Sequence, residues 1–272
     1  MKVLLATPYL SANWFDSGLF WAAALSRQGH LVRLWDYRLE PRPLTSDIDF
    51  MLILKGPVEP LPHCVNVCYW PDAVERTPGI ENVLKAYNSV YTCLRPTPND
   101  MQWEPTGWDP LIHKPTVNEK SIESVFIGTG TERKWQFLQA MRPMAIFGNN
   151  WHQFRPGGFL LPVYCHEMVA MFSSAKVSIN IHQDPIGLNR RFFESMACTF
   201  TITDLVPGVE EVLGKELAAL VGFKSPEEGR ERLEYFKSHD KEREELWQAE
   251  RKAIEPFTYE EAVERILRVE AP

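Results

Sequence analysis

Residues 187–197 read GLNRRFFESMA, and they are followed by the apolar, β-branched run TFTIT at 199–203 and by Asp204. This pattern predicts a short helix that begins at two arginines and leads into a strand. Free N–H groups at a helix N-terminus, together with arginines, suit the binding of a diphosphate. A carboxylate one turn further along, Glu194, suits the hydroxyls of a sugar or a ribose. Pairing of these charges on an exposed helix is the alternative interpretation.

Short strands alternate with helical patterns on both sides of this stretch. Strand candidates lie at 2–7, 31–37, 51–55, 65–70 and 89–93, and a second series lies at 123–128, 144–148, 177–182 and 200–204. Strands separated by helix-length segments predict a doubly wound parallel sheet. We therefore expect an α/β protein with two Rossmann-like domains, 1–115 and 116–255, facing a cleft. A closing helix in 256–272 can pack back on the first domain.

The composition of the 272-residue chain is that of a folded protein, because 44% of its residues are hydrophobic and 12% are aromatic. Its net charge of −7 argues against sequence-independent binding of nucleic acid. A local basic cleft stays compatible with that charge. No apolar run reaches the roughly 18 residues that a membrane span needs.

The five cysteines are odd in number and form no C-x-x-C pair. Buried free thiols in a reducing cytosol are favoured over a metal site. The first eight residues contain too short an apolar stretch for a signal peptide and read as a first strand. These features favour a cytoplasmic protein.

Five segments follow one another in order: VFIGT at 125–129, IFGNNW at 146–151, SAKVSINI at 174–181, NRRFFESMA at 189–197, and TD at 203–204. Together they resemble the nucleotide-sugar-binding half of group 1 type glycosyltransferases, in the branch of the CgeB spore-maturation-like proteins. The similarity covers about residues 120–270. It implies a GT-B fold whose C-terminal domain binds a nucleoside-diphosphate sugar and whose N-terminal domain holds the acceptor.

The turn at 128–131 is a candidate site for the donor diphosphate. Gly128 ends a predicted strand, Thr129 follows, and the next helix carries Arg133 and Lys134. Small residues let backbone N–H groups approach a phosphate, and adjacent cations neutralise it. The resemblance favours Arg133 as the basic residue on the diphosphate. An ordinary turn that uses Gly128 for its backbone freedom is the alternative.

Further donor-binding candidates lie on the following strands. Gly148 and Trp151 fit a strand end with a stacking aromatic, although a core aromatic explains Trp151 equally well. Lys176 matches a position of the family, with snorkelling from a strand edge as the competing view. Asn180 and His182 end their strand near the cleft, where either could touch the sugar, but a lone histidine is more often structural.

The opening stretch supplies the remaining donor-binding candidates. Asn189 begins the segment that resembles the family, and Arg190 is favoured over Arg191 for stabilising the departing diphosphate. The resemblance implies that Glu194 holds the ribose hydroxyls. Many retaining relatives carry another acidic residue eight positions earlier, where this chain has Ile186. The retaining two-glutamate mechanism is therefore not carried over.

Two aspartates in the first half are candidate general bases for an acceptor hydroxyl. Asp16 precedes a predicted helix, and a role as the N-cap of that helix is the alternative. Asp72 follows a predicted strand, where an aspartate also suits a turn.

These observations predict a metal-independent glycosyltransferase, a hexosyltransferase, that uses a nucleoside-diphosphate sugar, foremost a UDP-sugar, and no cofactor. Metal independence is expected because no His, Asp and Glu cluster has the spacing of metal ligands. The acceptor would be a carbohydrate, a protein or a modified nucleic acid. A nucleotide-sugar epimerase of the same fold and a non-catalytic nucleotide-sugar-binding or structural protein are the alternatives.

Overall fold

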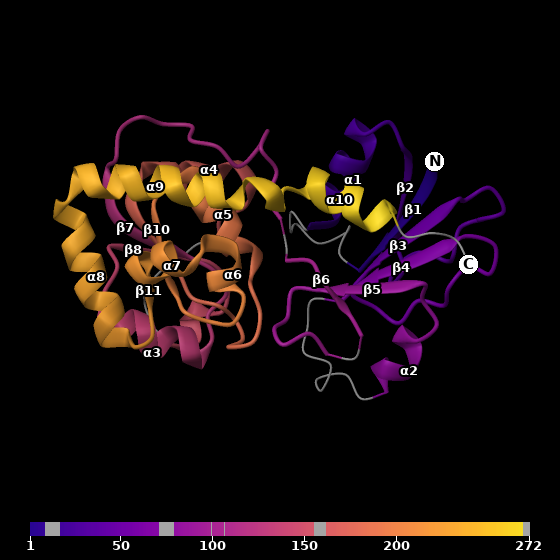
Figure 1. Ribbon diagram of the computed structural model, residues 1–272, viewed down its shortest axis with the longest axis horizontal. Helices are drawn as coiled ribbons and strands as arrows, with labels where there is room; N and C mark the ends of the chain where they lie inside the picture. Colours follow the sequence, from indigo (N-terminus) through magenta and orange to yellow (C-terminus); the bar gives the residue numbers. More distant parts are fainter. Residues whose placement is uncertain (9–16, 71–78, 99, 106, 155–161, 269–272) are drawn as a thin grey trace. The chain divides into compact units, whose positions relative to one another are not determined.

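The computed structural model describes residues 1–8, 17–70, 79–98, 100–105, 107–154 and 162–268 (Figure 1). It divides into two compact units. Unit 1 comprises Met1–Asp109 and Thr258–Pro272, and unit 2 comprises Pro110–Phe257.

Unit 1 is built on a parallel sheet with the strand order β2-β1-β3-β4-β5-β6. Its central strands are almost continuously buried, as expected for a parallel sheet that is covered on both faces. The elements are β1 (Lys2–Thr7), α1 (Ser17–Arg27), β2 (Leu31–Asp36), β3 (Phe50–Leu54), β4 (Val65–Tyr69), α2 (Ile80–Leu84), β5 (Ser89–Thr92), β6 (Gln102–Trp103) and α10 (Tyr259–Leu267).

Helix α10 comes from the end of the chain and packs beside α1 (Figure 1). The buried ring of Tyr259 lies with its centroid 5.4 Å from the rings of both Phe20 and Trp21. The guanidinium of Arg265 donates to both carboxylate oxygens of Glu104, at 2.7 and 2.8 Å. Apolar and ionic contacts thus make α10 part of unit 1.

Unit 2 contains a second parallel sheet, with the strand order β11-β10-β9-β7-β8. The chain runs outward in both directions from β7, so the strand order reverses between β7 and β9. The elements are β7 (Ile122–Ile127), α3 (Glu132–Met141), β8 (Ala145–Phe147), η2 (Trp151–Gln153), α4 (Cys165–Ser174), β9 (Ala175–Asn180), α5 (Arg190–Cys198), β10 (Thr201–Asp204), α6 (Val209–Leu213), α7 (Lys215–Val221), β11 (Gly222–Phe223), α8 (Pro226–Ser238), α9 (Asp240–Ile254) and η3 (Glu255–Phe257).

The two parallel sheets with their helices confirm the doubly wound α/β fold expected from the sequence. All five cysteines are free thiols, and four of them are buried. Within the described part of the chain, no helix has both the length and the apolar content needed to cross a bilayer.

A buried carboxyl group ties helix α9 to the sheet of unit 2. Oε2 of Glu250 accepts a hydrogen bond of 3.0 Å from the backbone N–H of Thr201, at the start of β10. The side chain of Glu250 is fully buried, and this burial raises its pKa well above 4.5, against the opposing effect of the Thr201 hydrogen bond. The protonated form is therefore the one that the fold favours.

The contribution of Glu250 to the free energy of unfolding should consequently fall as the pH rises. The contribution of Glu250 is fully present below its unfolded pKa and is lost as the pH rises through the folded pKa. Glu250→Gln keeps the shape but cannot ionise, so we expect the free energy of unfolding of the variant to rise relative to wild type between pH 5 and pH 9. Urea denaturation at both values measures this. Glu245→Gln, at an exposed position of the same helix, should show no such trend, and a pH-independent difference for Glu250→Gln would contradict the assignment.

Candidate functional site

The carboxyl ends of β7, β8, β9 and β10 meet at one edge of the sheet of unit 2, because the strands are parallel. The strand order reverses between β7 and β9, and ligands of open α/β sheets bind at such a reversal. Helices α3 and α5 begin shortly after β7 and β9. Their N-termini therefore lie at the same edge and present free backbone N–H groups there.

Two glycines allow the turns after β7 and β8 to pack against each other. Gly148 has φ 133°, and a Cβ atom at this residue would lie 2.0 Å from the carbonyl oxygen of Gly128. The N–H of Gly128 donates to the carbonyl of Phe147 at 2.9 Å. The indole N–H of Trp151 donates to the carbonyl of Gly128 at 2.8 Å, and its buried ring packs edge-on against Phe126. Trp151 is thus a core aromatic that holds the two turns together.

Helix α3 begins with a capped turn and a buried lysine. The hydroxyl of Thr131 accepts from the backbone N–H of Lys134 at 3.4 Å. The side-chain amine of Lys134 donates to Oε1 of Gln183 at 2.9 Å and to the carbonyl of Thr129 at 3.3 Å. Only 5% of Lys134 is exposed, and this burial lowers its pKa to about 8, although the carboxylate of Asp204 acts in the opposite direction.

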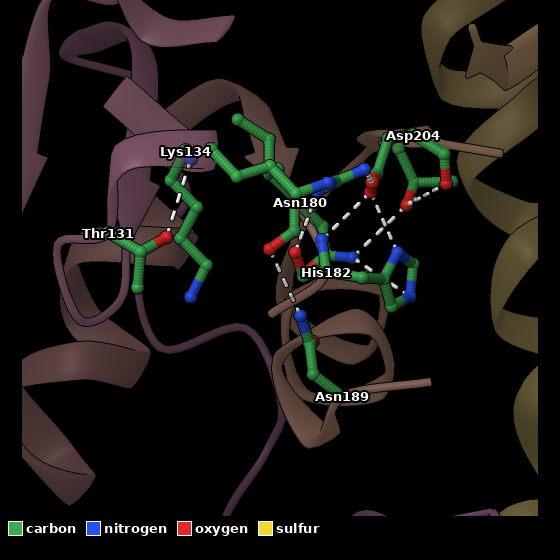
Figure 2. Close-up of polar contacts among 9 residues, drawn as sticks. Thr131, Lys134, Asn180, His182, Asn189 and Asp204 are labelled. Atoms are coloured by element: carbon green, nitrogen blue, oxygen red, sulfur yellow. Dashed lines mark hydrogen bonds and ion pairs between the residues drawn. The ribbon is translucent and has the colours of Figure 1, made fainter. Parts of the chain in front are cut away.

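Arg133 is held by groups on the two neighbouring strand ends. Its guanidinium donates to Oδ2 of Asp204 at 2.6 Å and to the backbone carbonyl of His182 at 2.8 Å. The other oxygen of Asp204, Oδ1, accepts from the backbone N–H of His182 at 2.9 Å and lies 2.7 Å from its ring Nδ1 (Figure 2). Burial opposes the ionisation of Asp204, but the charges of His182 and Arg133 outweigh it, so its pKa lies below the usual value. These contacts fix the ends of β9 and β10 together.

Asn180 extends this network into the core of the sheet. Its side-chain amide donates to the hydroxyl of Thr203 at 3.1 Å and lies 3.4 Å from Nε2 of His182 (Figure 2). All three side chains are buried. Asn180 therefore orients the imidazole of His182 as well as the strand end.

Asn189 fixes the start of helix α5 to the end of β9. Its side-chain oxygen accepts from the backbone N–H of Phe192 at 3.0 Å, which is an N-cap contact. Its amide donates to the carbonyl of Ile181 at 3.2 Å. The cap places Arg190 and Arg191 in the first turn of the helix.

Glu194 is completely buried among three basic side chains. Oε2 contacts the guanidinium of Arg191, whereas Oε1 lies 3.6 Å from Nε of Arg190 and 3.6 Å from Nε2 of His113. Among the residues that the structure describes, none donates a hydrogen bond to Oε1. Burial opposes ionisation of Glu194, but Arg191, Arg190 and His113 outweigh it and lower the pKa of the carboxyl group. Glu194 is thus a buried carboxylate with one oxygen available for a further donor.

The structure brings most of the expected donor-binding residues to this edge. They are Gly128, Thr129, Arg133, Gly148, Asn180, Asn189, Arg190 and Glu194. Lys176 is not brought to it, because it is the second residue of β9 and lies toward the amino end of the strand, where its charge acts on Asp240. Asp16 and Asp72 lie outside the described residues.

Sequence reasoning missed one of the groups that meet here. The sequence names Lys134 among the cations of helix α3, although the resemblance favours its neighbour Arg133 for the diphosphate. His113 belongs to the segment before β7, and nothing in its local sequence indicates that it lies against a helix 81 positions later. Among the described residues, no three His, Cys, Asp or Glu side chains gather as metal ligands would.

Residues 133–268, half of the chain, match the family described as glycosyl transferase-like. A comparison with curated proteins gives no match.

Several solved structures share the fold. An alpha-glucosyltransferase in complex with UDP and a 13-mer DNA is 13% identical and has a TM-score of 0.67, covering 98% of this chain and 100% of its own. T4 phage BGT in complex with its UDP-glucose substrate is 13% identical, with a TM-score of 0.58 and the same coverage. T4 phage BGT in complex with UDP and Mn²⁺ is 12% identical, with a TM-score of 0.61 and again the same coverage.

Proposed function

Because the chain belongs to the glycosyl transferase-like family, we propose that it transfers a sugar from a nucleoside-diphosphate sugar to an acceptor hydroxyl. One observation carries this proposal. The N-termini of α3 and α5 lie at the carboxyl edge of the sheet, together with the cationic side chains of Lys134, Arg190 and Arg191. Helix N-termini and cations are the groups that bind a diphosphate and stabilise it as it leaves.

Glu194 is proposed to bind the ribose of the donor. Its oxygen Oε1 accepts no hydrogen bond from the residues that the structure describes, and nitrogen atoms of Arg190 and His113 lie 3.6 Å away. A ribose hydroxyl that donates to Oε1 would satisfy this buried acceptor. Because the carboxyl group is fully buried, a bound donor must displace the guanidinium of Arg190, which lies beside Oε1.

A UDP-sugar is the proposed donor, since related structures were solved with UDP and with UDP-glucose. The test is thermal unfolding in the presence of UDP-, GDP-, ADP- and TDP-sugars, because a ligand that binds only the folded state raises the midpoint temperature. UDP-glucose is expected to raise it, and the guanine and adenine donors are not. No rise with any donor would overturn the proposed function.

The reaction is proposed to need no metal, with cations and helix N-termini in the role that a divalent ion plays elsewhere. One structure of the same fold contains Mn²⁺, so the metal requirement of the reaction must be measured directly. Transfer assays should be run with EDTA and with added Mn²⁺. Equal rates would support the proposal, and a loss in EDTA that Mn²⁺ restores would contradict it.

The acceptor is proposed to bind unit 1, where Asp16 or Asp72 would act as general base. A carbohydrate or protein acceptor fits this unit better than DNA. Its sequence contains 11 Lys and Arg against 16 Asp and Glu, whereas nucleic-acid binding needs a basic surface. An enzyme of the same fold was solved with a 13-mer DNA, so DNA is the comparison acceptor in transfer assays.

The sequence also supports a finer placement. We propose that the protein belongs to the CgeB-like branch and works in the cytoplasm, in keeping with its free cysteines. The second candidate function is that of a protein that binds the donor but does not turn it over. It is kept because Ile186 stands where many retaining relatives have an acidic residue. Product analysis separates the candidates, since an epimerase changes the donor without an acceptor and a binding protein changes nothing.

Arg190→Ala should lower turnover more than donor affinity. Arg190 lies at the first position of α5 and is one-quarter exposed, while the contact between Arg191 and Glu194 does not depend on it. We expect kcat to fall about 100-fold, as for removal of one transition-state donor, with the donor Kd changed only a few-fold. Steady-state kinetics and calorimetric titration with UDP measure the two quantities. Arg230→Ala, at an exposed position of α8, is the control, and an unchanged kcat for Arg190→Ala would refute the assignment.

A further inference from the structure

The amine of Lys134 is buried, yet within the described part of the chain its hydrogen bonds go only to neutral oxygens. The acceptors are the amide oxygen of Gln183 and the backbone carbonyl of Thr129. A buried ammonium ion is costly unless an anion accompanies it. Lys134 therefore lies at the candidate diphosphate site with no hydrogen bond to a carboxylate of the described residues.

Charged groups from four segments face this amine. Asp204 on β10 and Asp184 in the segment after β9 favour the charged form, whereas Arg133 on α3 and Arg191 on α5 disfavour it. Asp204 is itself engaged by Arg133 and His182. The balance of these charges does not offset burial, so the pKa of Lys134 falls to about 8. A substantial share of the protein therefore carries a neutral amine at mildly alkaline pH.

We propose that binding of a diphosphate at this edge draws a proton from solvent onto the buried amine of Lys134. The proposal rests on the proposed function, because it requires a nucleoside diphosphate at this edge of the sheet. The step adds H⁺ to –NH₂ and yields –NH₃⁺, and no bond of the donor breaks. Arg133, whose guanidinium donates to Asp204 and to His182, serves as a brace for the strand ends.

Two measurable consequences follow from this proton uptake. The affinity for a nucleoside diphosphate should fall at high pH, because only the protonated fraction of the protein binds well. For a group with a pKa of about 8, that fraction drops about tenfold between pH 7 and pH 9, and the apparent Kd rises by the same factor. Each binding event should also take up protons, about 0.5 at pH 8 and about 0.9 at pH 9.

Isothermal titration with UDP at pH 8 and pH 9, in two buffers of different ionisation enthalpy, counts these protons. The terminal phosphate of UDP is ionised at both values, because phosphate groups of this kind titrate near pH 6, roughly. Proton uptake that increases from pH 8 to pH 9 supports the inference. UDP binding without uptake overturns the inference and leaves the proposed function intact. Failure of UDP to bind at pH 7 overturns the UDP-sugar proposal and the inference with it.

Lys134→Arg provides an independent check, because a guanidinium stays charged over this pH range. The variant should bind UDP with no proton uptake and with the same Kd at pH 7 and pH 9. Lys215→Arg, at the exposed first residue of α7, is the matched control and should keep the wild-type uptake. Wild-type uptake in Lys134→Arg would assign the proton to another group and overturn the inference.

Discussion

Glu194→Ala is expected to lower the free energy of unfolding of unit 2 by about 3–5 kcal/mol, the cost of breaking a buried ion pair by removing one partner. The carboxylate is fully buried and is shared by Arg190, Arg191 and the buried His113. Its removal leaves these basic groups together without the carboxylate that offsets their charge. The same variant should lose measurable UDP binding, because the proposed ribose contact disappears. Urea denaturation and calorimetric titration measure the two effects.

Two further variants separate charge from shape at this position. Glu194→Gln keeps the volume and should be destabilised less than the alanine variant. Glu210→Ala, at an exposed position of α6, should change stability by less than about 0.5 kcal/mol. Because the pKa of Glu194 is lowered, its stabilising effect is present above the unfolded pKa and is lost as the pH falls through the folded pKa. A destabilisation of Glu194→Ala below about 1 kcal/mol at pH 7 would show that the buried contacts contribute little.

Gly148→Ala is expected to destabilise unit 2 by about 4 kcal/mol or more, in the range that only a few mechanisms reach. Two costs coincide at this residue. Its φ of 133° is strained for any side chain, and a Cβ atom would lie 2.0 Å from the carbonyl oxygen of Gly128. That oxygen belongs to the backbone and accepts from Trp151, so it cannot move away without breaking the turn. Thermal and urea unfolding of the purified variant measure the loss.

Gly214→Ala is the matched control for this prediction. Gly214 also has a positive φ, 76°, and lies in unit 2, but apart from its neighbours along the chain no described residue has an atom within 4 Å of the position that a Cβ would take. Gly214→Ala should therefore cost only the strain of a positive φ, about 1–3 kcal/mol of unfolding free energy. Equal losses in the two variants would mean that the close approach of the two turns is unimportant.

The strands and helices that could be predicted from the sequence are those with a clear period. β1 was predicted with its observed bounds, and α5 was predicted to begin at its two arginines, as it does. The two-residue strands β6 and β11 and the five-residue helix α2 were not predicted. Such short elements carry too few residues for a period to stand out, and neighbouring strands or packing determine them instead.

The candidate site was predictable where it depends on local chemistry. The turns, the arginines and Glu194 follow from motifs. The burial of Lys134 follows only if a charged residue is counted in the periodic buried face of its helix. Lys134, Leu138 and Met141 are spaced by four and three residues and form the buried stripe of α3. Arg133 lies one position off that stripe. The contact between His113 and Glu194 could not be predicted, because it joins segments that only the folded chain brings together.

The return of α10 to unit 1 has a consequence for how the protein is made. Its packing on Phe20 and Trp21, together with the hydrogen bond from Tyr259 to Trp108, completes a core whose other parts are translated first. On the ribosome, Pro110–Phe257 can collapse into its own core before those last contacts exist. Unit 1 can thus complete its core only after residues 259–267 have been synthesised, which is later than unit 2 needs.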